Sequence, residues 1–264
     1  MPMRIQVFGP LRVLADDARP AMTSVPGRTN RQVLQILAAH SGRPVSKDRL
    51  VDLLWESGPP DHPRQVVEHH VAEVRRGLYA QTPHGDTVVR CERAGYRLDL
   101  DRVSIDLAEF KAAVDDLSTW LHLDRVRHAL ELSERELFED EPDADWAVET
   151  RREVRRRRCD LLVRAAELDL AAGDPLAAVR DAGDALGIEP HLEAAHRVLV
   201  CAYYVCGEPG LALSAYRTCR DRLVDDCGVE PSPHTRSVHE AVFRGLGVAD
   251  VMRRLTVPQG LRTA

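Results

Sequence analysis

The sequence predicts an α+β domain, made of a small sheet, three helices and a β-hairpin, followed by an all-α domain. Short runs of β-type alternation flank a region of helical periodicity within the first hundred residues. β-type patterns then stop near Asp101. A chain of 264 residues is also long enough for two domains of roughly 100 to 150 residues each. We therefore expect domains over residues 1–100 and 101–247, with a C-terminal tail over 248–264.

The composition is typical of a globular protein, with 44% hydrophobic and 30% charged residues. No segment approaches the roughly 18 uninterrupted apolar residues of a membrane span, and the first residues resemble a strand rather than a signal peptide. We expect a cytoplasmic protein with no membrane partner. Its six cysteines form no C-x-x-C pair and no zinc spacing with histidine, so a reduced protein without metal or other cofactor is expected.

The charge is divided unevenly along the chain. Residues 1–100 hold 14 Lys and Arg against 11 Asp and Glu, whereas residues 101–264 hold 22 against 31. The net charge of −6 alone would argue against a nucleic-acid partner. Because phosphate binding needs clustered positive charge, the first hundred residues are the better candidate for DNA contact.

Short strands are expected at both ends of the first domain. Residues 5–8 and 11–14 alternate in the β manner around Gly9 and Pro10, which suggests a small antiparallel sheet. Residues 87–90 and 96–100, joined by residues 91–95, predict a β-hairpin.

Two helices are expected between these strands. Residues 29–39 place apolar side chains on one helical face, after a possible cap at Thr29 or Asn30. Ser46 is a plausible N-cap for a second helix, which packs through an apolar face that ends at Trp55.

The third helix, expected over residues 61–78, separates an apolar stripe from a polar face. Asp61 or His62 would cap it, with Pro63 in its first turn. An ordinary surface helix shows the same amphipathic pattern, so its neighbours decide the interpretation. The stripe consists of Val67, Val71, Val74 and Leu78.

A sheet, three helices and a hairpin in this order are the layout of a winged helix-turn-helix, whose third helix enters the major groove of DNA. The variant with a leading sheet resembles the OmpR-type DNA-binding domain. Three segments carry the resemblance: SKDRLVDLLW at 46–55, VAEVRRGL at 71–78 and RAGYRL at 93–98.

The second domain is expected to be tetratricopeptide-like. Its segment GDPLAAV at 173–179 returns as GEPGLAL at 207–213, an offset of 34 residues that is the period of a tetratricopeptide repeat. A chance recurrence in a Gly- and Ala-rich region is the alternative. Helices are expected over residues 105–121, 126–137, 143–172, 175–186, 192–206, 210–226 and 233–246.

A winged helix of this type followed by a tetratricopeptide-like domain resembles the SARP family, the Streptomyces antibiotic regulatory proteins. In the second domain the resemblance is carried by DLAEF at 106–110, by Glu141-Pro142 with Trp146, and by GVEPSP at 228–233, which resembles the family's bacterial transcriptional activation domain. The resemblance implies a transcriptional activator for a specialised-metabolite (antibiotic) gene cluster. Such proteins bind direct repeats in promoter DNA as homodimers, hold RNA polymerase holoenzyme there, and catalyse no reaction.

The candidate DNA contacts follow from side-chain chemistry. On the polar face of the third helix, Gln suits adenine, Arg suits guanine, a methyl group suits thymine and a carboxylate suits the cytosine amino group. A solvated helix face is the alternative. Base-reading candidates are Gln65, His69, Ala72, Glu73 and Arg76; backbone candidates are Lys47, Arg49, Arg64, Arg75, Arg90, Arg93 and Arg97.

Three further interpretations concern single segments. Glu73 stands where the related pattern usually has arginine, so base preference cannot be transferred from relatives.

The loop of Trp55, Glu56 and Asp61 is a candidate contact for RNA polymerase, because the matching loop of OmpR-type proteins can face the polymerase. The arginine-rich run at 151–158 is expected to be a solvated or interdomain-pairing face.

Other classes of function have less support. None of the common nucleotide-binding, serine-hydrolase or zinc-protease motifs occurs, so no enzymatic activity is expected. The rival interpretation is a tetratricopeptide-type adaptor that binds proteins and lacks specific DNA binding. A salt titration on DNA would separate the two, because DNA affinity falls steeply with ionic strength.

Overall fold

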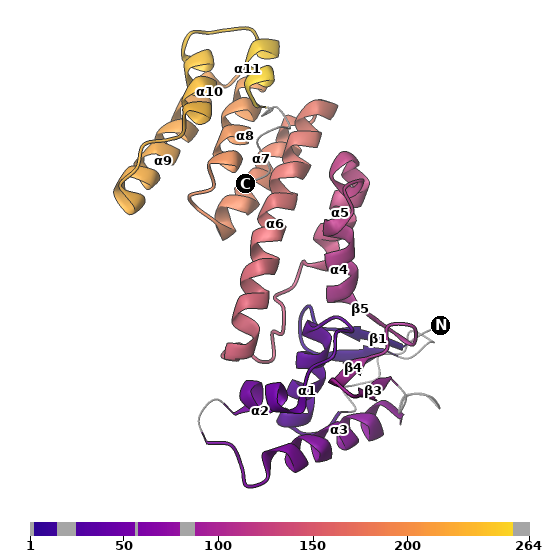
Figure 1. The fold of residues 1–264 in the computed structure, drawn as a ribbon. Helices are drawn as coiled ribbons and strands as arrows, with labels where there is room; N and C mark the ends of the chain where they lie inside the picture. The colour runs from indigo at the N-terminus through magenta and orange to yellow at the C-terminus, as the bar shows by residue number, and fades with distance from the viewer. Residues whose placement is uncertain (1–2, 15–24, 56–57, 80–87, 256–264) are drawn as a thin grey trace. The chain divides into compact units, whose positions relative to one another are not determined.

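The computed structural model describes residues 3–14, 25–55, 58–79 and 88–255 (Figure 1). The chain divides into two compact units, which are Met1–Asp116 with Glu131–Val154, and Leu117–Leu130 with Arg155–Ala264. The long helix α6 (Asp145–Ala172) contributes residues to both units. Among the described helices, none has the length and apolar character needed to cross a membrane.

The sheet of the first unit has the strand order β2-β1-β5. Strand β1 (Met3–Gln6) pairs antiparallel with β2 (Arg12–Leu14) and parallel with β5 (Val103–Ile105). Ile5 lies opposite both Val13 and Ile105 in register, and all three side chains are buried. The predicted leading sheet is therefore present, but it is mixed rather than purely antiparallel.

Strand β5 corrects the expectation that β structure ends near Asp101. It has three residues, which is too short for an alternating pattern to show, and helix α4 (Asp106–Asp115) begins directly after it. The helix predicted over residues 105–121 is also divided, because α4 ends at Asp115 and the 3-10 turn η2 spans Thr119–Leu121.

Asp106 joins the start of α4 to the sheet. Its buried carboxylate accepts hydrogen bonds from the backbone N–H groups of Val7, Phe8 and Leu107 at 2.8 to 3.1 Å. Burial raises the pKa of this carboxyl group, although the backbone donors favour its charged form.

The three predicted helices are present as α1 (Arg28–Ala39), α2 (Lys47–Leu54) and α3 (Pro63–Tyr79). The Ser46 side chain accepts from Arg49 N–H at 3.1 Å, which confirms the predicted cap of α2. The prediction that Thr29 or Asn30 caps α1 is wrong. Gly27 precedes α1 with a φ of 89°, no side chain caps the helix, and the Asn30 amide donates to Pro26 O at 2.6 Å.

The segment from residue 131 to residue 154 belongs to the first unit. It pairs with the chain after β1, where Gly9 N donates to Glu136 O and Phe138 N donates to Val7 O, both at 2.8 Å. The buried Glu141 carboxylate then accepts from Arg28 and Gln32 of α1 at 2.9 Å. Residues far along the chain thus complete the core of the sheet and helix α1.

Arg151 fixes this segment from within α6. Its guanidinium donates to the carbonyl oxygens of Leu137, Phe138, Glu141 and Pro142 at 2.6 to 3.0 Å, and the residue is only 8% exposed. The prediction that the run at 151–158 is a solvated or interdomain-pairing face is therefore wrong for Arg151, because carbonyl groups of a loop in its own unit surround its guanidinium.

The second unit is helical, as predicted. Helix α8 packs against both α7 and α9, and α10 and α11 pack against α8 and against each other. Residues 248–255, which the sequence placed in a tail, form α11, with Val251 and Leu255 buried. The helices are α5 (Leu123–Leu132), α7 (Pro175–Ile188), α8 (Glu193–Val205), α9 (Pro209–Cys227), α10 (Pro233–Phe243) and α11 (Val248–Leu255).

The segments that recur after 34 residues form the same kind of turn between two helices. Gly173 after α6 and Gly207 after α8 both have positive φ, 85° and 78°, and each leads through an acidic residue into a helix that begins with proline. Ala178 and Ala212, which correspond in the two copies, are both fully buried. The recurrence therefore has a structural basis in paired helices and is not an accident of composition.

Two buried carboxylates in this unit share one arginine. Arg127 Nη2 lies 2.6 Å from both Asp169 Oδ2 and Asp181 Oδ2. Burial, and next the contact with Asp181, raises the pKa of Asp169 to about 6.

This arrangement predicts a pH-dependent stability. Between about pH 4 and pH 6 the native protein keeps the proton of Asp169 and the unfolded chain loses it, so the free energy of unfolding falls as pH rises through this window. The contribution is on the order of 2 kcal/mol. Urea titrations across this pH range are expected to show a smaller fall for Asp169→Asn than for the wild type. Equal falls would contradict the assignment.

Candidate nucleic-acid interface

Helix α3 combines a buried face with an exposed one. Val67, Val71, Val74 and Leu78 are at most 1% exposed, which confirms the predicted stripe, and they pack α3 against α1 and α2. The polar face turns to solvent. Of the predicted base-reading residues, Gln65, His69, Ala72 and Arg76 are exposed and Glu73 is half-buried.

The first turn of α3 is set by backbone geometry. Pro63 begins the helix, where its missing N–H has no partner to lose. His62 before it has a φ of 55°, and its carbonyl accepts from Gln65 N at 2.9 Å. These contacts fix the backbone of the first turn of α3 and therefore the direction in which the Gln65 side chain points.

His70 is a packing residue of α3. Its Nδ1 lies 2.7 Å from Asn30 Oδ1 on α1, and its ring centroid lies 6.3 Å from that of Trp55. Burial, and then the neighbouring His69, lowers the pKa of His70. The half-buried His70 ring therefore packs α3 against α1.

The hairpin of β3 (Val89–Glu92) and β4 (Gly95–Leu98) forms the predicted wing. Its register pairs Glu92 with Gly95, so only residues 93 and 94 connect the strands, rather than the expected 91–95. Predicted residue 87 lies outside the described ranges. Strand β4 is anchored to the chain before α2, because Val45 and Tyr96 exchange backbone hydrogen bonds of 2.8 and 2.9 Å.

Gly95 allows this close approach. A Cβ atom at this position would lie 2.0 Å from Val45 O, and the residue has a φ of 139°, which side chains rarely tolerate. The neighbouring Tyr96 is 5% exposed, with Lys47 Nζ 5.8 Å and the Arg75 guanidinium 5.9 Å from its ring centroid. Tyr96 therefore packs the wing onto α2 and α3.

The predicted backbone-contact residues differ in their surroundings. Arg75 donates twice to Val89 O, at 3.0 and 2.8 Å, and so ties α3 to β3. Arg90 pairs with the buried Asp99 at 2.7 Å, and Arg97 pairs with Glu92 at 2.5 Å. The side chains of Arg49 and Arg93 are exposed and form no hydrogen bond or ion pair with any described residue.

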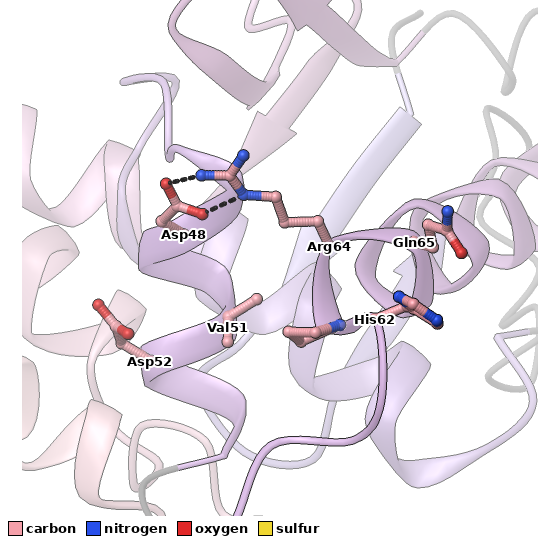
Figure 2. Close-up of a pocket in the computed structure, with 7 residues that line it drawn as sticks. Asp48, Val51, Asp52, His62, Arg64 and Gln65 are labelled. Atoms are coloured by element: carbon pink, nitrogen blue, oxygen red, sulfur yellow. Dashed lines mark hydrogen bonds and ion pairs between the residues drawn. The ribbon is translucent and has the colours of Figure 1, made fainter.

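Carboxylates hold the remaining cations between α2 and α3. Lys47 forms an ion pair with Glu68, and the hydrogen bond that its ammonium group donates to the Glu68 carboxylate is the main reason why the pKa of Lys47 is raised. Arg64 forms a two-point contact with Asp48 at 2.6 and 2.7 Å, and this contact lowers the pKa of Asp48 (Figure 2). Farther along α3, Arg76 pairs with Glu73 at 2.6 Å.

A shallow depression of about 630 Å³ lies between α2 and the start of α3 (Figure 2). Trp55 follows the last residue of α2 and is half-buried, and Asp61 before α3 is exposed. Glu56, the third residue of the predicted polymerase contact, lies outside the described residues. The depression is lined by Asp48, Val51, Asp52, His62, Pro63, Arg64 and Gln65.

Two family models match this chain. The model described as "Transcriptional regulatory protein, C terminal" matches residues 26–98, and the one described as "Bacterial transcriptional activator domain" matches residues 98–243, more than half of the 264 residues. The chain belongs to the SARP family of transcriptional regulators. The OmpR-type winged helix and the helical activation domain of this SARP-family regulator were both predicted from its sequence, and both are confirmed.

The regulator is similar to proteins of known name over most of its length. The transcriptional regulatory protein EmbR of Mycobacterium tuberculosis (strain H37Rv) is 28% identical over 248 residues, which are 90% of this chain and 62% of EmbR. The regulator therefore spans about three fifths of the length of EmbR. The regulatory protein DnrI of Streptomyces peucetius is 27% identical over 258 residues, or 92% of each chain.

A solved structure shows the same fold. Mycobacterium tuberculosis EmbR, in complex with a low-affinity phosphopeptide, matches with a TM-score of 0.80 and 22% sequence identity over 96% of this chain and 69% of that one.

Sequence reasoning missed the carboxylates that hold the cations of the regulator. Asp48 and Glu68 were not among the predicted site residues, although each pairs with a residue that was. Lys47 and Glu68 lie 21 residues apart, and Asp48 and Arg64 lie 16 apart. Only the packing of α2 on α3 brings them together, so no local pattern could indicate these pairs.

Proposed function

We propose that the regulator is a sequence-specific DNA-binding activator that inserts α3 into the major groove of promoter DNA. The observation that carries the proposal is the exposed row of Gln65, His69, Ala72 and Arg76, opposite a fully buried stripe. In a winged helix-turn-helix this face meets the base edges. Donors, acceptors and a methyl group on it match what the major groove offers.

Glu73 is included among the base-reading residues. Its Oε1 atom accepts a hydrogen bond of 2.6 Å from Arg76 Nη1, so it orients the Arg76 side chain, and it lies 4.0 Å from His69 Nε2. A carboxylate at this place suits the amino group of a cytosine and disfavours bases that present only acceptors. The preferred DNA site should therefore contain a C·G pair under the middle of α3.

Backbone contacts would position the domain without specifying sequence. Arg49 at the start of α2 and Arg93 at the tip of the wing are exposed and have no described partner, so they are the foremost phosphate contacts. Lys47, Arg64, Arg90 and Arg97 could join them after exchanging carboxylate partners. Arg75 contributes mainly by holding the wing, because Val89 O occupies its guanidinium.

The activating step is proposed from the family. The regulator would bind direct repeats near promoters of a specialised-metabolite gene cluster in the cytoplasm, as a homodimer, and recruit RNA polymerase holoenzyme. Trp55, Glu56 and Asp61, between α2 and α3, are the proposed polymerase contact, and of these Asp61 is exposed. DNase footprinting of the full chain on promoters beside its own gene tests the DNA-binding part. Protection of a repeated sequence supports it, and the absence of any protected site contradicts it.

Arg76→Ala is expected to weaken binding to the footprinted site about tenfold or more, because a guanidinium on guanine contributes about 1 to 3 kcal/mol of discrimination. Binding to a random-sequence duplex should change less. Arg49→Ala serves as the matched control, since loss of a phosphate contact weakens both duplexes alike. Fluorescence anisotropy on the two duplexes measures both effects. If Arg76→Ala weakened binding to both duplexes equally, Arg76 would be a contact to the DNA backbone rather than a base-reading residue.

The alternative is an adaptor that binds proteins through the helices of the second unit. Its support is the repeated turn at Gly173 and Gly207, which produces the stacked helix pairs common in protein-binding repeats. An adaptor would show no affinity difference between promoter and random duplexes. A DNA-binding regulator shows both a difference and a steep salt dependence.

A further inference from the structure

The surface proposed to meet DNA is largely neutralised by its own carboxylates. Lys47 and Arg64 are each held by an acidic residue of the neighbouring helix, and both ion pairs join the first turn of α2 to the first two turns of α3. The four side chains are between 37% and 68% exposed. The pairs are therefore open to an approaching duplex.

Such pairs should affect random and cognate DNA differently. An exposed ion pair is weak, so a phosphate can replace the carboxylate as the partner of the cation. The released carboxylate then stands beside the phosphates and repels them. Nonspecific binding consists almost entirely of phosphate contacts, so this repulsion has nothing to offset it there.

A cognate site can accommodate the released carboxylate. Glu68 is exposed on α3, one residue before the base-reading His69, and a glutamate in the major groove accepts a hydrogen bond from the amino group of cytosine. A C·G pair at this position would stabilise the Glu68 carboxylate while Lys47 moves to a phosphate. On the cognate duplex Lys47 and Glu68 would then each gain a DNA partner. On a random duplex Glu68 would gain none.

We propose that Glu68 is a specificity-determining residue that withholds Lys47 from random DNA and releases it on a site with a matching C·G pair, and that Asp48 withholds Arg64 from phosphates in the same way. The inference rests on the proposed DNA binding. It adds that specificity depends on weakened nonspecific contacts as well as on base reading.

The test uses the full chain with Glu68→Gln and Asp48→Asn, each measured in a salt titration on a random-sequence duplex and on the footprinted promoter duplex. Each variant is expected to bind the random duplex about fivefold more tightly than the wild type at low salt. The slope of log affinity against log salt should steepen by about 0.9 for the released cation. Affinity for the promoter duplex should rise less or fall, so the ratio of the two affinities decreases.

Glu240→Gln is the matched control, because Glu240 of α10 pairs at 2.5 Å with the exposed Arg244, directly after that helix, and the substitution changes the net charge equally. It should leave both affinities unchanged. In a Lys47→Ala background, Glu68→Gln should lose most of its gain on the random duplex. Thermal melts of every variant should match the wild type, since the side chains lie at the surface.

The outcomes separate the two proposals. Salt-dependent binding by the wild type, with no gain from Glu68→Gln and Asp48→Asn beyond that of Glu240→Gln, would overturn the inference and leave the DNA-binding proposal standing. An undiminished gain in the Lys47→Ala background would also overturn it, because Glu68 would then act only as a repelling charge. No binding by any variant to either duplex would reject both proposals.

Discussion

Gly95→Ala is expected to lower the free energy of unfolding by about 3 kcal/mol or more and to abolish specific DNA binding. The new methyl group would lie 2.0 Å from Val45 O and 2.7 Å from Ser46 Cα, and both neighbours are backbone. The wing must move away from the start of α2 to relieve this contact. The hydrogen bonds between Val45 and Tyr96 would then be lost, together with the cap of α2 at Ser46.

Gly207→Ala provides the control for Gly95→Ala. Gly207 also has positive φ, 78°, but a Cβ atom there would meet nothing within 4 Å. Only the backbone strain remains, which costs about 1 kcal/mol. Urea denaturation followed by circular dichroism measures both variants, and anisotropy measures DNA binding. Similar losses of stability for the two variants would show that the close contact with Val45 is relieved at little cost in free energy, and would contradict the prediction.

Arg151→Met is expected to lower the free energy of unfolding by about 4 kcal/mol. The substitution keeps much of the side-chain volume but removes the donors that four loop carbonyls share. Those carbonyls are oriented toward the guanidinium and would be left without it. The loop also carries Glu141, so its contacts with Arg28 and Gln32 of α1 should weaken as well.

Arg152→Met is the matched control for Arg151→Met. It changes the neighbouring arginine of the same helix, whose side chain is 75% exposed and lies 3.6 Å from Glu149. A surface pair of this kind contributes at most about 1 kcal/mol, so the stability should remain near that of the wild type. Chemical denaturation of both variants at one pH gives the comparison. A loss for Arg151→Met no larger than for Arg152→Met would contradict the buried role.

The parts of the fold that sequence could predict are those with a local cause. The 17 residues of α3 are long enough for the 3.6-residue period to place Val67, Val71 and Val74 on one face without ambiguity. Ser46 caps α2 through its own side chain. The turns at Gly173 and Gly207 occur in two similar segments of the sequence, 173–179 and 207–213. Each of these depends on residues that are neighbours along the chain.

The parts that sequence missed depend on contacts between distant residues. Strand β5 is defined by pairing with β1, about a hundred residues earlier, and has too few residues to show alternation. The charged neighbours of Arg151 predict a solvated or interdomain-pairing face, whereas the carbonyl groups around its guanidinium come from residues 137–142. In the interface, sequence named the cations of α2 and α3, and folding supplied Asp48 and Glu68 as their partners.

The return of residues 131–154 to the sheet and α1 has a consequence for how such regulators can be recombined. The two family models meet at residue 98, which is where a chimaera between relatives would naturally be joined. A hybrid cut there would inherit Arg28 from one parent and Glu141 and Arg151 from the other. Exchange of DNA specificity between members of the family should therefore succeed only when both parents match at these interlocking positions, or when the later segment is transplanted too.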